Sequence, residues 1–255
     1  MLLAVDIGNT HIDLGLFAAG YLQAQSTLPT HPDWDRARWA REMRRVLPLP
    51  PQGPAAVAIA SVVQDKAALL AKACRTLGAG EIAQVDASWD LGLEIAYDHP
   101  QQVGIDRLLG AAAARTACPQ GHHAIVADAG TAITVDAVRA DGLFCAGAIT
   151  PGLHLGLGAL SGGTSLLPTV PLRADAPLLS RNTPAGLQSG ALHGNAALLD
   201  GLFERLEARL GAPAWGLLGG GDGPVLWPHT RRFARLEPAL VLRGLHQAYC
   251  RHRPS

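Results

Sequence analysis

Cysteine is scarce in this sequence, and the spacing of the few cysteines present excludes two kinds of site. They occur far apart and form no C-x-x-C pair: Cys74, Cys118, Cys145 and Cys250. This pattern predicts free thiols in a reducing cytoplasm and no metal bound through sulfur. The apolar start of the chain has no basic region or cleavage site, so we expect no secretory signal.

Lysine is scarcer still, which excludes one common phosphate-binding loop. Only Lys66 and Lys72 are present, and neither follows a G-x-x-x-x-G segment, so a Walker-type loop is excluded. A G-x-G-x-x-G segment is also missing from the first strand-to-helix turn, which argues against a dinucleotide site. If the chain binds nucleotide phosphates, glycine turns and magnesium must neutralise their charge.

Charge is low and balanced. Charged residues make up 16% of the chain, with 21 basic and 21 acidic residues, whereas 48% of the residues are hydrophobic. A net charge of zero supplies no field to attract nucleic acid or an anionic membrane, so we expect a small-molecule partner. The composition is typical of buried sheets flanked by helices, and therefore of a folded α/β protein.

Residues 143–172 contain no charged side chain, which raises the question of a membrane span. Proline and glycine interrupt this stretch repeatedly. We therefore expect a buried strand followed by a helix and a loop. His154 lies in the stretch, and we favour a core histidine over a ligand at this position.

The strand pattern at the start of the chain recurs in its second half. Apolar segments punctuated by glycine predict three strands at the start of each half: residues 2–7, 11–17 and a third from residue 21, then residues 123–129, 132–138 and 143–150. D-I-G-N-T at 6–10 aligns with D-A-G-T-A at 128–132. Asp and Gly are also common in ordinary turns, but two copies in the same strand pattern indicate an internal duplication.

The two aligned turns have the chemistry of phosphate sites. Gly8 and Gly130 allow close approach, and their N–H groups can hold phosphate oxygens. Asp6, at a strand end, could hold hydrated magnesium, because this hard cation prefers carboxylate oxygen and retains several waters. Thr10 and Thr131 could donate hydroxyl hydrogen bonds to the phosphates.

A third segment, residues 97–107, leads into an alanine-rich helix that extends to about residue 116. Asp106 and Arg107 lie near its start, where the helix dipole stabilises an acidic side chain. A first-turn acid with no other role is the simplest interpretation. The adjacent arginine and the preceding Gly104, which permits close substrate approach, favour a binding site.

Five motifs occur in order along nearly the whole chain: D-I-G-N-T at 6–10, Y-x-x-P-x-x-V-G-x-D-R at 97–107, D-A-G-T-A-x-T-x-D at 128–136, G-A-I-T-P-G at 147–152 and N-T at 182–183. Together they resemble the type III pantothenate kinase family, of the actin-like, hexokinase-like superfamily. The resemblance implies a homodimer of duplicated ribonuclease-H-like halves, residues 1–117 and 118–255. Each half would contain a mixed five-stranded sheet flanked by helices, with ATP in the cleft between the halves.

The resemblance also implies roles for individual residues. The expected ATP contacts are Asp6, Ile7, Gly8, Asn9, Thr10, His11, Ile12, Asp13 and Thr131. The expected pantothenate contacts are Tyr97, Gly104, Ile105, Asp106 and Arg107, with Thr183 contributed across the dimer. Asp106 would be the catalytic base, Asp128 a ligand of a monovalent cation, and Asp6 a magnesium ligand through water.

The implied activity is ATP-dependent phosphorylation of pantothenate to 4′-phosphopantothenate, the first step of coenzyme A biosynthesis, with Mg-ATP and K⁺ or NH₄⁺. One alternative is a kinase or phosphatase of the same superfamily acting on another small acceptor. Another is a non-catalytic, transcription-accessory regulator. Asp13 stands where some family members have a basic residue, and the glycine run at 219–223 leaves the adenine contacts unassigned.

Residues 182–194 contain two further features with more than one interpretation. Thr183 followed by Pro184 is an ordinary helix start, with Thr as the N-cap, and this role is compatible with a binding role. Gly186, Gly190 and Gly194 recur every four residues, which puts them on one helix face. That face could pack within the chain or against a second copy of it.

Overall fold

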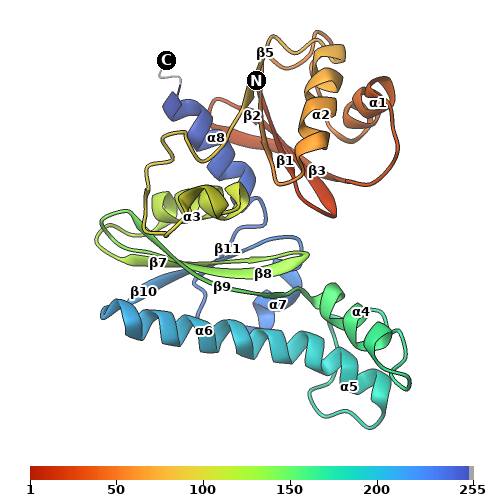
Figure 1. Cartoon of the computed structure of the whole chain (residues 1–255), viewed down its shortest axis with the longest axis vertical. Coiled ribbons are helices and arrows are strands. Elements are labelled where there is room, and N and C mark those ends of the chain that lie inside the picture. Colours follow the sequence, from red (N-terminus) through yellow and green to blue (C-terminus); the bar gives the residue numbers. More distant parts are fainter. Residues whose placement is uncertain (253–255) are drawn as a thin grey trace. The chain divides into compact units, whose positions relative to one another are not determined.

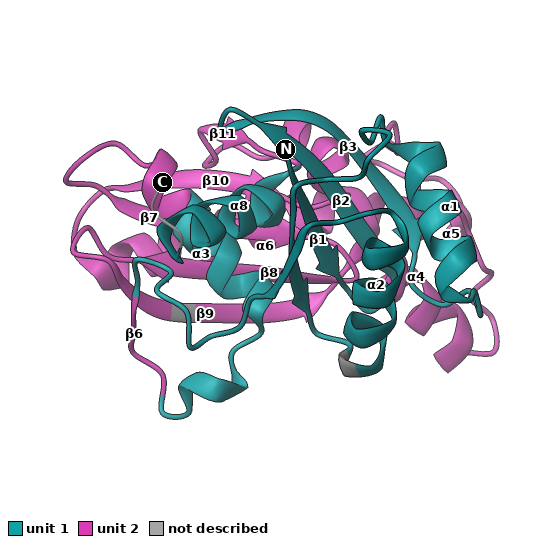
Figure 2. Ribbon diagram, turned by 90° about the horizontal axis from the view of Figure 1, so that it is seen from above, with its two compact units in different colours: residues 1–93, 98–113, 239–255 teal, residues 94–97, 114–238 magenta. Residues whose placement is uncertain are grey.

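The computed structural model describes residues 1–252, apart from the side chains of Gln64 and Ala146. The chain forms two compact units, coloured separately in Figure 2. The first unit contains residues 1–93 and 98–113 and the chain from residue 239 onward. The second contains residues 94–97 and 114–238. For the duplicated halves we expected a single boundary after residue 117. The two compact units divide the chain differently, because the chain from residue 239 onward joins the first unit.

The first unit is built on a five-stranded sheet in the order β3-β2-β1-β4-β5. Its strands are β1 (Leu2–Ile7), β2 (His11–Ala18), β3 (Tyr21–Pro29), β4 (Ala56–Ser61) and β5 (Glu81–Gln84). The β1–β2 and β2–β3 pairs are antiparallel, whereas β4 lies parallel to both β1 and β5.

Helices cover both faces of this sheet (Figure 1). Leu3, Val5 and Ile7 of β1 pack in one core with α1 (Arg36–Val46) and α2 (Gln64–Thr76), which contribute Trp39, Met43 and Cys74 among others. Helix α8 (Leu240–His252) packs against β1, β2 and β4. Because successive strand residues point to opposite faces, burial of β1 on both sides explains its unbroken apolar start.

The second unit repeats this plan. Its sheet has the order β11-β10-β7-β8-β9-β6, with β7 (His123–Ala129), β8 (Ala132–Val138), β9 (Leu143–Pro151), β10 (Ala214–Gly219) and β11 (Arg235–Leu236). Strands β7 to β11 match β1 to β5 in order and direction. The duplication predicted from the sequence is therefore confirmed.

This second sheet has six strands rather than the expected five, because β6 (Glu94–Ile95) adds to the edge beside β9. Helix α6 (Asn195–Leu210) buries Leu199 and Phe203 against the sheet. Helices α4 (Leu153–Gly163), α5 (Thr183–Ser189) and α7 (Gly223–Leu226) complete this unit with a π-helical turn at Gly190–Gly194.

Helix α3 (Ile105–Ala117) follows a short 3-10 turn at Pro100–Gln102. It crosses α8 at very short range, since a Cβ atom at Gly244 would collide with the Leu109 carbonyl. Only glycine allows this approach. Within residues 1–252, no helix combines the length and the hydrophobicity needed to cross a membrane.

Candidate active site

The first glycine turn joins β1 to β2. The Gly8 N–H donates to the His11 carbonyl at 2.9 Å, which closes the turn. Thr30, whose side chain is buried, holds it from the side: its hydroxyl donates to the Gly8 carbonyl at 2.8 Å, and its N–H donates to the Thr10 carbonyl at 2.9 Å. Asn9, Thr10 and His11 are exposed at the tip. This turn can therefore present exposed groups to a ligand from a braced backbone.

Two of the predicted ATP contacts of this region point into the core. The side chains of Ile7 and Ile12 are fully buried in the core with α1 and α2. They can face a nucleotide only through their backbone groups. Their contribution is to fix the strands that carry the turn.

Two carboxylates lie opposite each other on the strands β1 and β2 that this turn connects. Asp6 and Asp13 are direct partners in the β1–β2 ladder, so their side chains lie on the same face of the sheet. Like charges at such positions are unfavourable unless something compensates them. The Thr27 hydroxyl donates to Asp13 Oδ1 at 2.6 Å, which satisfies one acceptor. A bound cation would compensate the pair further.

The second glycine turn joins β7 to β8 and is shorter. The Gly130 N–H donates to the Ala132 carbonyl at 3.0 Å. Asp128 precedes the turn, but its partner in the ladder is Thr134, so only one carboxylate lies at this position. Thr131 is exposed in the turn.

Two glycines from other parts of the chain, Gly152 and Gly220, lie in close contact with the backbone of this second turn. The Gly152 N–H donates to the Thr131 carbonyl at 3.0 Å, and a Cβ atom at Gly152 would collide with the Gly130 and Thr131 carbonyls. A Cβ atom at Gly220, which has φ +83°, would collide with the Ala129 carbonyl and with Asp128 Oδ1. The site in the second unit is thus formed where three glycine-containing segments meet.

Sequence reasoning missed part of this arrangement. The Asp222 N–H donates to the Ala129 carbonyl at 2.9 Å, and Asp222 Oδ1 lies 3.7 Å from Nε2 of His154. The His154 side chain is 70% exposed, so the expectation of a core histidine is wrong. It lies in the first turn of α4, two residues after Gly152, which contacts the β7–β8 turn. The glycine run at 219–223 was the available signal for this loop.

The start of α3 places Asp106 as the sequence predicted. Asp106 lies in the first turn of the helix and is half-buried, and its Oδ1 accepts a hydrogen bond from the Arg107 N–H at 2.8 Å. A Cβ atom at Gly104 would collide with Asp106 Oδ1, so the carboxylate in this position occupies the space that a side chain at residue 104 would take. Ile105 is buried, and its side chain anchors the helix start instead of facing a ligand.

The remaining predicted substrate contacts lie in the second unit. Tyr97 is exposed and follows β6 closely. Thr183 is exposed and begins α5, but the cap is supplied by Asn182, whose side chain accepts from the Ala185 N–H at 2.9 Å. The expectation that Thr183 is the N-cap is therefore wrong.

The duplicated sheets, each with a glycine turn between its first two strands, define an α/β protein of the actin-like, duplicated ribonuclease-H-like class. The sequence profile of the type III pantothenate kinase family matches residues 2–205. The chain belongs to this family.

Individual relatives agree over the full length. A type III pantothenate kinase from Rubrobacter xylanophilus is 37% identical over 98% of this chain and 97% of its own. One from Thermomicrobium roseum is 35% identical over 99% and 98%. Among solved structures, a conserved protein from Campylobacter jejuni, described as a candidate Baf family transcriptional activator, matches with a TM-score of 0.58 at 18% identity, covering 99% and 98% of the two chains. This last similarity supports the fold alone.

Proposed function

We propose that this chain transfers the γ-phosphate of ATP to the primary hydroxyl of pantothenate and releases 4′-phosphopantothenate and ADP. The observation that carries the proposal is the start of α3, where the half-buried carboxylate of Asp106 lies against Gly104 and is held by the Arg107 N–H. The membership of the chain in the type III pantothenate kinase family supports the choice of acceptor.

Asp106 is the proposed catalytic base. In the proposed reaction its carboxylate orients the pantothenate hydroxyl and accepts the proton as the oxygen attacks phosphorus in line. The bond from the Arg107 N–H to Oδ1 fixes the direction of the carboxylate. Arg107 is suited to the carboxylate of pantothenate or to phosphate charge, because its planar guanidinium matches both.

The two glycine turns are the proposed phosphate sites. The exposed groups of residues 9–11 and of Thr131 would donate to phosphate oxygens, and the close approach of Gly152 and Gly220 leaves the second turn without side-chain bulk. These donors would stabilise charge on the phosphates as the reaction proceeds. Asp222 and His154 lie beside the second turn and join the proposed nucleotide site.

Two cations fit the carboxylates of the turns. The Asp6–Asp13 pair fits hydrated magnesium, which when bound with ATP neutralises phosphate charge. Within residues 1–252 there is no cluster of three or more His, Cys, Asp or Glu side chains able to hold a metal. Magnesium would therefore keep waters and phosphate oxygens as its remaining ligands. The single carboxylate of Asp128 fits a monovalent cation, K⁺ or NH₄⁺.

A homodimer is part of the proposal. Large apolar side chains are exposed in and after α4, notably Leu166 at 89% and Leu179 at 88%. A Cβ atom at Gly190 or Gly194 would meet nothing within 4 Å, so these glycines serve no close packing within the described chain. A second copy covering this surface would bring Thr183 to a shared site. Light scattering should give twice the chain mass, and an active monomer would remove the shared-site role of Thr183.

The reducing cytoplasm is the proposed location. All four cysteines are free thiols, and Cys74 and Cys118 are buried. A metabolic kinase with this thiol pattern suits a compartment in which disulfides do not form.

The test is an ADP-release assay with pantothenate, acetate, glucose or water as the acceptor, on the wild-type chain and on Asp106→Asn. We expect release with pantothenate, and a fall in turnover of about 10²–10⁴ in the variant, the usual contribution of a positioned base. Asp98→Asn is the matched control, because Asp98 is an exposed acid in the same segment. Near-normal turnover of Asp106→Asn would remove the base assignment. Silence with every acceptor would favour the regulator, and preference for another acceptor would favour a different kinase.

A further inference from the structure

Three polar side chains form a row across the first three strands of the first unit. Asp6 of β1 pairs with Asp13 of β2, and Asp13 pairs with Thr27 of β3. Directly opposite residues of neighbouring antiparallel strands point to the same face, with Cβ atoms about 4.5–5.5 Å apart. The two carboxylates are therefore close enough to share a cation. All three residues belong to one sheet of one unit.

This row lies on the same face of the sheet as helix α8. The residues next to its members, Ile7, Ile12 and Leu28, are buried in the core with α1 and α2. Because successive strand residues point to opposite faces, the row faces the other way. On that face, a Cβ atom at Gly15 would lie 3.2 Å from Leu242 of α8. The acids of the row are half-exposed and the threonine is exposed, so a dissolved cation can reach them.

The threonine fixes the direction of one carboxylate. The Thr27 hydroxyl donates to Asp13 Oδ1 at 2.6 Å. A hydrogen bond to an ionised acceptor is roughly twice as strong as one between neutral groups. This bond restricts the rotation of the carboxylate and leaves Oδ2 able to bind another ligand. A hydroxyl adds no positive charge, so the attraction of the two acids for a cation is retained.

The second unit contains the corresponding row with a different composition. Its members are Asp128, Thr134 and Ile149. This row has one carboxylate, and its third member is an exposed isoleucine, which can donate no hydrogen bond from its side chain. The duplicated strand pattern therefore requires neither a second acid nor a donor beside it. Both are features of the first unit, and they need an explanation that is specific to its turn.

We propose that Thr27 is a positioning residue for the divalent cation: it holds Asp13 so that this carboxylate and that of Asp6 bind the cation together, even before a nucleotide is present. This inference rests on the proposed role of the first turn as a phosphate site. The kinase family to which the chain belongs implies ATP with a divalent cation. A hard cation such as Mg²⁺ prefers carboxylate oxygens and keeps waters as its other ligands.

The expected size of the effect follows from the position of Thr27 behind a ligand. Hydrogen bonds to a carboxylate that binds a metal typically contribute about 10–100-fold to metal affinity. Because this row is open to solvent, we expect the lower end of that range. Thr27 acts only through Asp13, so a serine, which keeps the hydroxyl, should replace it.

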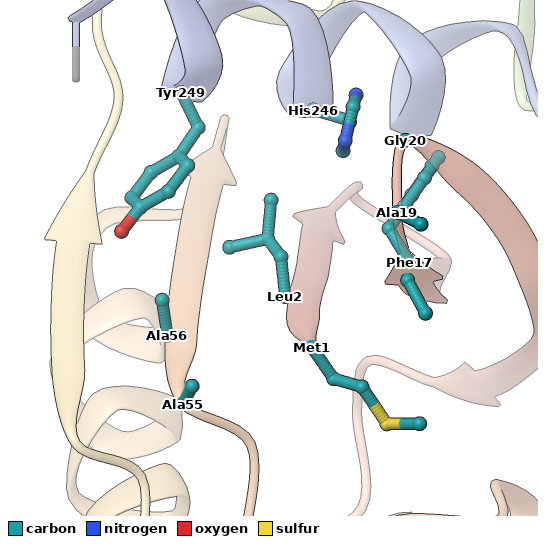
Figure 3. A pocket seen from close by; sticks show the side chains of 10 residues that line it. Met1, Leu2, Phe17, Ala19, Gly20, Ala55, Ala56, His246 and Tyr249 are labelled. Atoms are coloured by element: carbon teal, nitrogen blue, oxygen red, sulfur yellow. The ribbon is translucent and has the colours of Figure 1, made fainter. Parts of the chain in front are cut away.

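A different place for a cation in the first unit would be the pocket at the start of β1. Figure 3 shows the side chains that line it, among them the imidazole of His246 and the phenol of Tyr249. None of the described residues that line this pocket is an acid. It therefore offers a hard cation no carboxylate oxygen.

The experiment measures binding of Mn²⁺, a paramagnetic substitute for Mg²⁺, to the full chain by electron paramagnetic resonance without any nucleotide. We expect the wild type to bind Mn²⁺ and added Mg²⁺ to displace it. Thr27→Val should lower the affinity about tenfold, and Thr27→Ser should restore it. Asp13→Asn should lower the affinity further, because it removes a charged ligand and keeps the shape of the side chain.

Two variants outside the row are the controls. Asp86 also accepts from a hydroxyl, that of Ser88 at 2.5 Å, but it lies outside the strands and has no acid paired with it. Asp86→Asn is therefore the matched control for the loss of an acid. His246→Ala is the control for the pocket. Both should bind Mn²⁺ as tightly as the wild type.

Thermal melting gives a second readout that does not need activity. A ligand that binds only the folded chain raises its Tm. Mg²⁺ should therefore raise the Tm of the wild type and of Thr27→Ser, and raise that of Asp13→Asn much less. The melts without metal show that each variant is folded.

Three outcomes would overturn the positioning role: no Mn²⁺ binding by the wild type without nucleotide, equal affinities of the wild type and Thr27→Val, or weaker binding by either control alone. The ADP-release assay separates this inference from the proposed function. If Mn²⁺ binds as expected but pantothenate is not phosphorylated, only the proposed function fails. If pantothenate is phosphorylated but Mn²⁺ binds only together with ATP, only the positioning role fails.

Discussion

The two glycine turns share a sequence pattern but are held in place by different means. The first turn is braced by a buried side chain, because Thr30 bonds to Gly8 and Thr10 from the end of β3. The second is enclosed by backbone, because Gly152 and Gly220 approach its carbonyls too closely for any side chain. A duplicated motif therefore kept its hydrogen-bonding chemistry while its support changed.

The difference indicates which positions can vary. A side-chain brace can be weakened in steps, since one hydroxyl can be removed or retained. Backbone contact at two glycines cannot be reduced gradually, because a single methyl group already collides. We therefore expect the second turn to be the more sensitive of the two to substitution.

The largest effect that separates the turns should come from Gly220→Ala. The new methyl group would collide with the Ala129 carbonyl and Asp128, and the backbone at φ +83° disfavours it as well. A displacement of about 1 Å can cost 10²-fold, so we expect kcat/KM for ATP to fall by about that factor. Gly221→Ala is the control, because its Cβ would meet nothing within 4 Å. Equal kinetics of the two variants would mean that backbone contact does not support the turn.

Much of the fold was predictable because its strands are short, apolar and bounded by glycine. The predictions for residues 2–7, 123–129 and 132–138 agree with β1, β7 and β8 at both ends. Strand β6 was missed because its two residues, Glu94 and Ile95, are recruited by pairing with β9, and nothing in their local pattern indicates a strand. The return of α8 to the first unit is likewise a tertiary contact, made where Gly244 meets Leu109.

The candidate site was predictable where one sequence motif contains both the glycine and the acidic residue close to it. Gly8, Gly130 and Gly104 each lie two residues from an acidic residue of the same motif, so their proximity to it was visible in the sequence. Gly152 and Gly220 serve a turn that is distant in the sequence, and no local pattern reveals that contact. Asn182 was overlooked as the cap because Thr183 is also a good cap, and only the backbone shows which residue begins the helix.

A second difference between the turns lies in their carboxylates. Asp6 faces Asp13, whereas Asp128 faces Thr134. We expect Asp128→Ala to abolish activation by potassium or ammonium and to raise KM for ATP about tenfold, the scale of one interaction with a charged group. Activity would be measured with and without potassium at constant ionic strength. Retained potassium activation in a folded variant would make Asp128 a structural turn acid.

A smaller effect should follow from removing the brace of the first turn. Thr30→Val leaves the part-buried Gly8 carbonyl without its donor, which should cost about 1 kcal/mol of unfolding free energy. KM for ATP should rise a few-fold, because the tip of the turn loses its lateral support. Thr30→Ser retains the hydroxyl and should stay close to wild type in both denaturant melts and kinetics. If valine and serine behave alike, the hydroxyl does not brace the turn.

The smallest expected effect is on the pH dependence of stability, and it compares a cysteine in the core of the first unit with one in the second unit. Cys74 is fully buried in the first core, and burial raises the pKa of its thiol above the usual value to about 12, whereas Cys145 in the second unit is partly exposed.

Above pH 9 the unfolded chain loses the Cys74 proton and the folded chain keeps it, so the unfolded state binds fewer protons and stability falls as pH rises. The stability present below pH 9 is lost by at most about 1.4 kcal/mol per pH unit up to the folded pKa. Other groups also titrate in this range, so the informative quantity is the difference in slope between wild type and Cys74→Ala in urea melts. Cys145→Ala is the control and should change the slope much less. A wild-type slope equal to that of Cys74→Ala would show that Cys74 ionises in the folded chain, and that the first core is more open to water than its packing indicates.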